Sequence, residues 1–153
     1  MHPPEADTVL VRYGEVGIKS PQLRGRMEQR LQENILALVE DRGLDGAVDR
    51  EHTRLYVRTD PSQIGAVTDA VTDAFGVVSA SPTRRVEPTM DAITEALAAA
   101  AREHYSGERF AVRARRAGPA SAHPFSSTDI EREGGAAVTE AATAAGHEPT
   151  VDL

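Results

Sequence analysis

The sequence predicts an α/β (α+β) chain made of two successive units. Short β-rich runs alternate with longer runs of helical periodicity, Gly and Pro mark the junctions, and a proline-containing connector over 82–88 divides the pattern. With 153 residues, of which 40% are hydrophobic, the chain is large enough to form a buried core. It contains no internal repeat or low-complexity tract, so we expect globular units.

The first unit opens with a β-rich run over 8–13 and a turn over 14–20. Pro21 follows, a residue preferred at the first position of a helix. Apolar residues then recur at helical spacing until Gly43, which provides a stop. The apolar positions are Leu23, Met27, Leu31, Ile35, Leu38 and Val39. The pattern predicts a strand, a turn and a helix with one apolar face.

The rest of this unit is predicted to hold a hairpin over 47–51 and 54–58, a helix and a last strand over 77–81. Asp60 is the expected N-cap of the helix, with Gln63 completing a capping box. The apolar positions of this helix are Ile64, Val67, Val71 and Phe75, and Gly76 ends it. The order β-α-β-β-α-β is that of a ferredoxin-like split βαβ domain, which we place at residues 1–86.

The second unit, residues 87–153, is predicted to contain two helices. The first ends before Gly107 and carries Ile93, Leu97, Ala100 and Ala101 at helical spacing. Thr128 and Glu131 have the spacing of a capping box at the start of the other helix. A final strand begins at Thr150 and the sequence stops at Leu153, so we expect this unit to lack its last strands and to leave a sheet edge unpaired.

Between these helices, residues 109–116 alternate strictly between apolar and basic side chains. A strand would direct Phe110, Val112 and Ala114 to one side, and Arg109, Arg113 and Arg115 to the other. These three arginines, the arginine stripe, have no acidic residue among them, and we interpret them as a phosphate-binding face. An ordinary exposed strand edge is the alternative.

A second group of arginines, Arg24, Arg26 and Arg30, lies within two turns of the first helix. Glu28 and Glu33 lie among these arginines, and we expect them to form ion pairs with the arginines within the helix. This favours a solvated helix face over a phosphate-binding one.

The composition bounds the classes of function. The net charge is −7, and only Lys19 among 17 basic residues is a lysine. This charge balance is typical of proteins from a high-salt cytoplasm. An ordinary acidic bacterial protein is the alternative. There is no cysteine, no membrane-length apolar run and no signal-peptide pattern, so we expect a cytoplasmic protein without thiol chemistry. The histidines lack metal-ligand spacing, and no metal site is expected.

Two further motifs have simpler structural interpretations. The segment Gly14–Ser20 resembles a nucleotide-binding loop, but Ile18 separates the last glycine from Lys19, and a tight turn with Ser20 as helix N-cap explains it better. His123, Ser127 and Asp129 offer the residue types of a hydrolytic triad, yet no serine elbow is present, and helix capping is the favoured interpretation.

Two stretches together resemble one family. Arg12-Tyr13-Gly14-Glu15-Val16-Gly17-Ile18-Lys19-Ser20 with Arg24 is similar to the opening signature of tRNA 4-thiouridine sulfurtransferases. Phe110 to Arg116, followed by His123-Pro124-Phe125-Ser126-Ser127-Thr128-Asp129-Ile130-Glu131-Arg132, resembles the signature of a THUMP domain, an RNA-binding unit of tRNA-modifying enzymes.

The resemblance implies a ferredoxin-like domain followed by a partial THUMP domain, which together hold the acceptor end of tRNA. The ATP-pyrophosphatase domain, with its ATP and Mg²⁺, is not part of this sequence, so no cofactor is expected here and a separate catalytic chain or a homodimer stays open. The expected RNA-binding residues are Lys19, Arg24, Arg109, Arg113, Arg115, Arg116, His123, Phe125 and Ser127. The alternatives are another THUMP-containing enzyme such as a methyltransferase, a stand-alone hydrolase, and an interaction protein without an RNA role.

Overall fold

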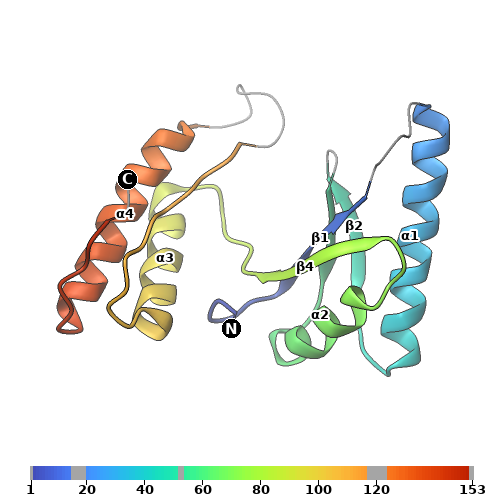
Figure 1. Cartoon of the computed structure of the whole chain (residues 1–153), viewed down its shortest axis with the longest axis horizontal. Coiled ribbons are helices and arrows are strands. Elements are labelled where there is room, and N and C mark those ends of the chain that lie inside the picture. Colours follow the sequence, from blue (N-terminus) through green and yellow to red (C-terminus); the bar gives the residue numbers. More distant parts are fainter. Residues whose placement is uncertain (1, 15–19, 52–53, 117–123, 152–153) are drawn as a thin grey trace. The chain divides into compact units, whose positions relative to one another are not determined.

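The computed structural model describes residues 2–14, 20–51, 54–116 and 124–151. The chain divides into two compact units, one over Pro4–Arg85 and the other over Val86–Leu153 (Figure 1). No helix in the described ranges is long and apolar enough to cross a membrane.

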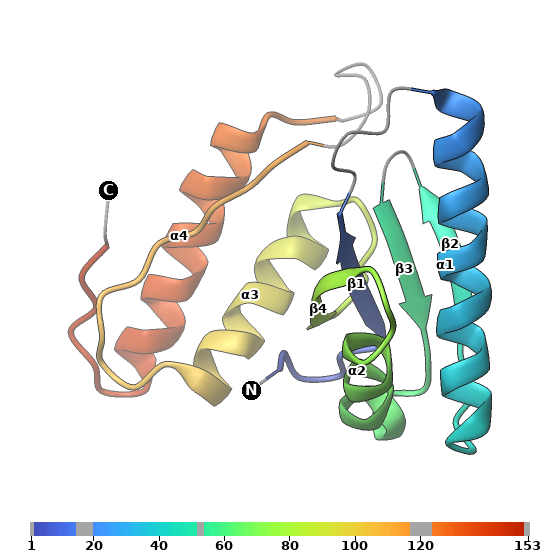
Figure 2. The same cartoon turned by 45° about the vertical axis from the view of Figure 1, so that its right-hand side comes forward.

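The first unit contains a four-stranded antiparallel sheet. Its strands are β1 (Thr8–Tyr13), β2 (Ala47–Glu51), β3 (Arg54–Arg58) and β4 (Val77–Thr83), in the order β2-β3-β1-β4. Helices α1 (Pro21–Asp41) and α2 (Ile64–Thr72) cover one face of the sheet, as Figure 2 shows. The ferredoxin-like arrangement predicted from the element order is therefore confirmed.

The core of this unit lies between the sheet and the two helices. Val9 and Val11 of β1 and Leu55 and Val57 of β3 are at most 1% exposed, and alternate residues of the same strands lie on the other face. The helices contribute Leu31, Ile35, Val39, Ile64, Val67, Ala70 and Val71 to the core. Pro82 is accommodated within β4 because this is an edge strand.

The ends of α1 follow the sequence signals. The Ser20 side chain accepts a hydrogen bond from the Leu23 amide, and Pro21 is the first helical residue. After the helix, Gly43 adopts a φ of +70°, which favours glycine. Leu23 and Met27, which we expected in the apolar stripe, remain 50% and 48% exposed because they precede the buried part of the helix.

Two expectations for α2 are wrong. Phe75 is 94% exposed, because the helix ends at Thr72 and the chain turns at Gly76, where φ is +95°, so the helical spacing does not reach it. Gln63 ends a 3₁₀ turn over Pro61–Gln63 instead of closing a capping box. Its Oε1 accepts a hydrogen bond of 3.0 Å from the Asp45 amide, and so it ties this turn to the segment before β2.

The second unit is built on two packed helices, α3 (Met90–His104) and α4 (Ser127–Ala144). Thr89 caps α3 by accepting a hydrogen bond of 3.2 Å from the Ala92 amide. Gly134 is buried on α4, where a Cβ atom would lie 2.7 Å from Leu97 Cδ1 and 3.2 Å from Val112 Cγ1. A side chain at this position would have to displace Leu97 and Val112, so glycine suits the close approach of α3 and the segment containing Val112 to α4.

The predicted strand over 109–116 does not form a hydrogen-bonded ladder. Among the described residues, its β pairing is one isolated parallel bridge between Phe110 and Val151, with Phe110 N donating to Thr150 O at 3.2 Å. The expectation of a regular strand is wrong because a strand requires a paired neighbour along its length, and the described part of the chain supplies one pair. The predicted final strand is likewise limited to the bridge at Val151, and residues 152–153 lie outside the described ranges.

Candidate nucleic-acid interface

The arginine stripe lies on the exposed side of the segment over 109–116. Arg109, Arg113 and Arg115 are exposed, whereas Phe110, Val112 and Ala114 are half-buried, so the alternation predicted from sequence is present without a ladder. The cationic face thus depends on the burial of the alternate apolar side chains.

Three contacts hold this segment against the two helices. Phe110 packs edge-to-face on Tyr105, with ring centroids 5.8 Å apart, and Val112 faces Gly134 on α4. The Ala114 amide donates a hydrogen bond of 3.1 Å to Oε1 of Glu131. A helix side chain therefore supplies the acceptor that a neighbouring strand would supply in a sheet.

This role for Glu131 corrects the prediction for the start of α4. The capping box consists of Ser126 and Asp129, because the Asp129 amide donates to Ser126 Oγ and the Ser126 amide donates to Asp129 Oδ2, both at 3.1 Å. Thr128 and Glu131 have the same spacing, but Thr128 lies one residue inside the helix. Spacing alone does not distinguish two overlapping capping boxes.

The capping contacts also define the chemistry of Asp129. Hydrogen bonds from the Ser126 amide and hydroxyl lower the pKa of this carboxylate, and the nearby Arg132 lowers it further. The cap therefore stabilises the helix above the ordinary pKa of an aspartate, and its contribution is lost as the pH falls through the lowered value. The described contacts of Asp129 thus agree with the capping interpretation of this motif, and His123 lies outside the described residues.

Arg113, Arg115 and Arg116 differ from several arginines of the first unit in their charge environment. Within the described ranges, Arg113, Arg115 and Arg116 make no ion pair with a carboxylate, and all three are exposed. Several arginines in the first unit are paired, as Arg42 is with Asp73 at 2.6 Å. The unpaired guanidinium groups are available to bind phosphates through two hydrogen bonds each.

The remaining predicted RNA-binding residues are distributed over both units. Phe125 and Ser127 are half-buried at the start of α4, beside the stripe in sequence, and Ser127 is the first residue of that helix. Arg24 lies on α1, where it lines a hollow of about 240 Å³ together with Tyr13, Met27 and Phe75. Lys19, His123 and most of the 14–20 turn lie outside the described residues.

The two glutamates among the second arginine group do not have the partners that we expected. Glu28 is buried, with 3% of its side chain exposed, and its Oε2 pairs with Arg50 Nε of β2 at 2.6 Å. Glu33 instead accepts a hydrogen bond of 3.5 Å from Gln29. The predicted intrahelical pairing of Glu28 is therefore wrong, because a neighbour from the sheet reaches the helix.

The fold and the exposed arginines define a class of two-unit α/β proteins with an arginine-rich segment on the surface of the second unit. Comparison with protein families matches residues 8–81 to the ThiI ferredoxin-like domain and residues 87–153 to the THUMP domain. The chain belongs to the tRNA sulfurtransferase family, of which it carries these two domains.

Named relatives agree with this assignment. A probable tRNA sulfurtransferase of Halobacterium salinarum is 52% identical over 153 residues, which are all of this chain and 38% of the relative. Another from Methanosarcina mazei is 38% identical and aligns with 97% of this chain and 36% of its own length. The chain thus spans little more than a third of the curated relatives it matches.

Solved structures have the same fold. The protein PH1313 of Pyrococcus horikoshii superposes with a TM-score of 0.79 at 27% identity, covering 96% of this chain and 47% of that one. A 4-thiouridine synthetase in complex with RNA and bound ATP superposes with a TM-score of 0.76 at 22% identity, covering 97% of this chain and 36% of that one. At 22% identity the second comparison supports the fold alone.

Proposed function

We propose that this chain is the tRNA-binding portion of a tRNA sulfurtransferase that forms 4-thiouridine at position eight of tRNA. The observation that carries the proposal is the exposure of the arginines on 109–116, of which Arg113, Arg115 and Arg116 make no ion pair among the described residues, in a segment that belongs to a THUMP domain. The match of residues 8–81 to the ThiI ferredoxin-like domain favours a sulfurtransferase over a THUMP-containing methyltransferase.

The physical basis is the fit between the stripe and an RNA backbone. Alternate residues of an extended chain are about 6.6 Å apart, comparable to successive phosphates along an RNA strand. Arginine remains charged at every relevant pH and binds a phosphate through a planar fork. Aromatic residues make up only 4% of the sequence, so recognition is mainly of backbone and shape. In this proposal, Lys19, Arg24, Arg116, His123, Phe125 and Ser127 assist the stripe.

The stripe is tested by reversing one charge. Arg113→Glu should weaken tRNA binding and reduce the slope of log affinity against log salt by about 0.7–0.9, or more because the charge is reversed. Filter binding or fluorescence anisotropy across a salt series measures both quantities.

Arg102→Glu is the matched control for this experiment. Arg102 is exposed on α3 and the substitution makes the same change in net charge away from the stripe. Equal affinity and equal salt slope in the parent and both variants would contradict the proposal and leave the stripe as a solvated face.

We also propose that catalysis requires a part of the enzyme other than this chain. The sequence has no cysteine, and its Gly14–Ser20 segment lacks the spacing of a phosphate-binding loop. The purified 153-residue chain should therefore neither hydrolyse ATP nor adenylate tRNA, and ATP with Mg²⁺ should act only with the catalytic domain. Release of pyrophosphate or phosphate above that of a blank, measured with tRNA present, would overturn this prediction.

We infer in addition that the chain works in a high-salt cytoplasm. A net charge of −7 with a single lysine supports this, and so does the origin of the Halobacterium salinarum relative. Because salt screens phosphate contacts, affinities for this chain must be compared at the same ionic strength.

A further inference from the structure

One face of the sheet in the first unit is not covered by α1 and α2, and we call it the open face. The side chains on this face alternate with the buried valines and leucines of the same strands. They are Thr8, Leu10, Arg12, Ala47, Asp49, Glu51, Arg54, Tyr56, Arg58, Ser79, Ser81 and Thr83.

Tyr56 occupies the middle of this open face. It lies on the inner strand β3, opposite Leu10 of β1 and Asp49 of β2, and it is half-buried. Among the described residues of the face it is the only aromatic side chain. A flat aromatic surface at the centre of a four-stranded antiparallel sheet is suited to supporting an unstacked RNA base.

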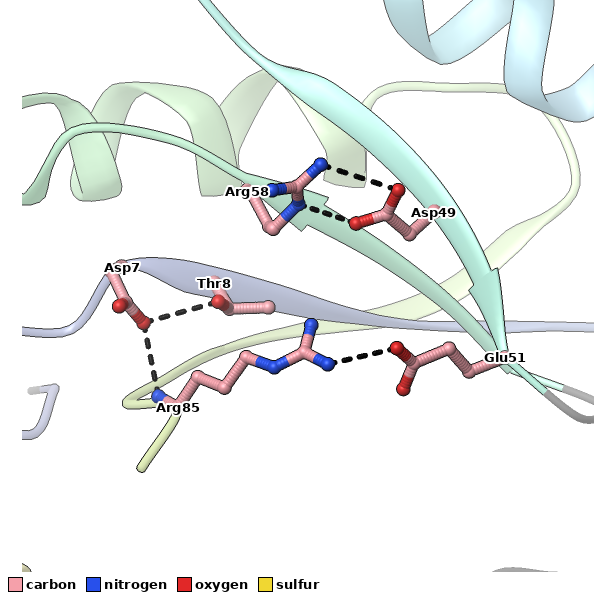
Figure 3. A network of polar contacts seen from close by, with 6 residues as sticks. All are labelled: Asp7, Thr8, Asp49, Glu51, Arg58 and Arg85. Atoms are coloured by element: carbon pink, nitrogen blue, oxygen red, sulfur yellow. Dashed lines mark hydrogen bonds and ion pairs between the residues drawn. The ribbon is translucent and has the colours of Figure 1, made fainter. Parts of the chain in front are cut away.

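A hollow of about 240 Å³ adjoins the tyrosine. It is lined by Thr8, Glu51, Tyr56, Thr83, Arg84 and Arg85. Arg85 reaches across the sheet from the end of β4 to Glu51, to which it donates a hydrogen bond of 2.8 Å (Figure 3). The hollow therefore combines an aromatic side chain with hydroxyl, guanidinium and carboxylate groups that can bind the edge of a base.

The charges on the open face are unevenly balanced. Arg58 pairs with Asp49 and Arg85 with Glu51, as Figure 3 shows. Within the described ranges Arg12 instead donates to the hydroxyls of Ser79 and Ser81, at 3.4 Å and 3.0 Å, and neither Arg12 nor Arg54 pairs with a carboxylate. Both lie just beyond the Val11–Leu55 pair that ends the β1–β3 ladder, so two arginines lie at one end of the face, with Glu51 of β2 opposite Arg54.

We propose that this open face binds one unpaired nucleotide of the RNA, with its base on Tyr56 in the hollow and the flanking phosphate on Arg12 and Arg54. The inference rests on the proposed tRNA binding and adds a site on the first unit that recognises single-stranded RNA. Arginines outnumber carboxylates on this face, which favours a polyanionic occupant such as RNA.

The test compares single-stranded with double-stranded RNA. A labelled octaribonucleotide without secondary structure and a blunt-ended hairpin are titrated with the 153-residue chain and its variants at low salt. Tyr56→Leu should weaken octamer binding by about 5- to 30-fold and change hairpin binding by less than about twofold. Tyr56→Phe, which keeps the ring, should bind the octamer like the parent.

Phe75→Leu is the matched control, since it removes a 94% exposed ring that lies outside the open face. Octamer binding should be unaffected by it. Unchanged binding by Tyr56→Leu, equal losses for octamer and hairpin, or the same loss in Phe75→Leu would each overturn the inference.

A second measurement does not depend on the folding of a variant. An octamer carrying 5-bromouridine is photo-cross-linked to the parent chain, and the modified peptide is identified by mass spectrometry. A cross-link at Tyr56 supports the site, and cross-links confined to other peptides contradict it. If the parent fails to bind intact tRNA, the proposed function fails as well; if tRNA binds while Tyr56→Leu has no effect, this inference alone fails.

Discussion

Replacing Arg50 with alanine is expected to lower the free energy of unfolding of the first unit by about 3 kcal/mol. The reason is that Glu28 is only 3% exposed and its Oε2 pairs with Arg50 at 2.6 Å. Neither carboxylate oxygen of Glu28 has a hydrogen-bond partner among the described residues, so the ion pair with Arg50 is the contact that offsets its burial. Without the guanidinium, a buried charge is left with no compensation, and restoring its hydration requires α1 to move from the sheet.

Urea unfolding of the first unit, followed through amide signals of β1 and β3, measures this effect. The control is Arg42→Ala, which removes a pair of the same 2.6 Å length to Asp73 whose side chains are 39% and 60% exposed. That variant should lose no more than about 1 kcal/mol. Adding Glu28→Gln to Arg50→Ala should recover part of the loss, and equal losses in the two single arginine variants would contradict the burial argument.

Replacing Gly134 with valine is expected to lower the stability of the second unit by about 2 kcal/mol. A Cβ atom at this position would lie 2.7 Å from Leu97 Cδ1 and 3.2 Å from Val112 Cγ1. The end of Leu97 can rotate away, but Val112 is branched at Cβ and restricted at χ1, so the segment that carries the stripe must shift. Loss of stability should therefore be accompanied by weaker tRNA binding.

Gly135→Val provides the comparison, because it makes the same substitution one residue further along α4. No described atom lies within 4 Å of a Cβ atom built on Gly135. The two residues differ little in helix propensity, so stability should stay within about 0.5 kcal/mol of the parent. Thermal unfolding monitored by circular dichroism distinguishes the two variants, and a loss in Gly135→Val equal to that in Gly134→Val would show that close packing is not the cause.

The sequence was most informative where local signals determine local structure. Pro21 and Gly43 marked the two ends of α1. The alternation of apolar and polar residues assigned the buried faces of β1 and β3. Helical periodicity failed at Phe75, because the end of α2 is set by the turn at Gly76 and not by the apolar spacing. Local rules work best where the decisive contacts are also local.

The candidate sites depended more on contacts between distant residues. The alternation of 109–116 identified the exposed arginines, but spacing could not show that Glu131 binds the Ala114 amide. The pairing of Glu28 with Arg50 was missed because the spacing rule compares residues of one helix, whereas Arg50 lies on β2, far from Glu28 in sequence. Tyr56 was recognised as part of an alternating strand, yet its place at the centre of an open sheet face follows only from the strand order.

The division of the chain into two units with separate cores has a consequence for affinity. In the proposals above, each unit contributes a weak site, the arginine stripe on one and the face around Tyr56 on the other, joined through the short stretch that includes Arg85 and Val86. Once one site is occupied, the second binds the same RNA molecule at a high effective concentration, so the intact chain can bind far more tightly than either unit alone. This bivalency also makes selection geometric: an RNA that presents a backbone and an unpaired nucleotide at the wrong separation is held by one site only and dissociates quickly.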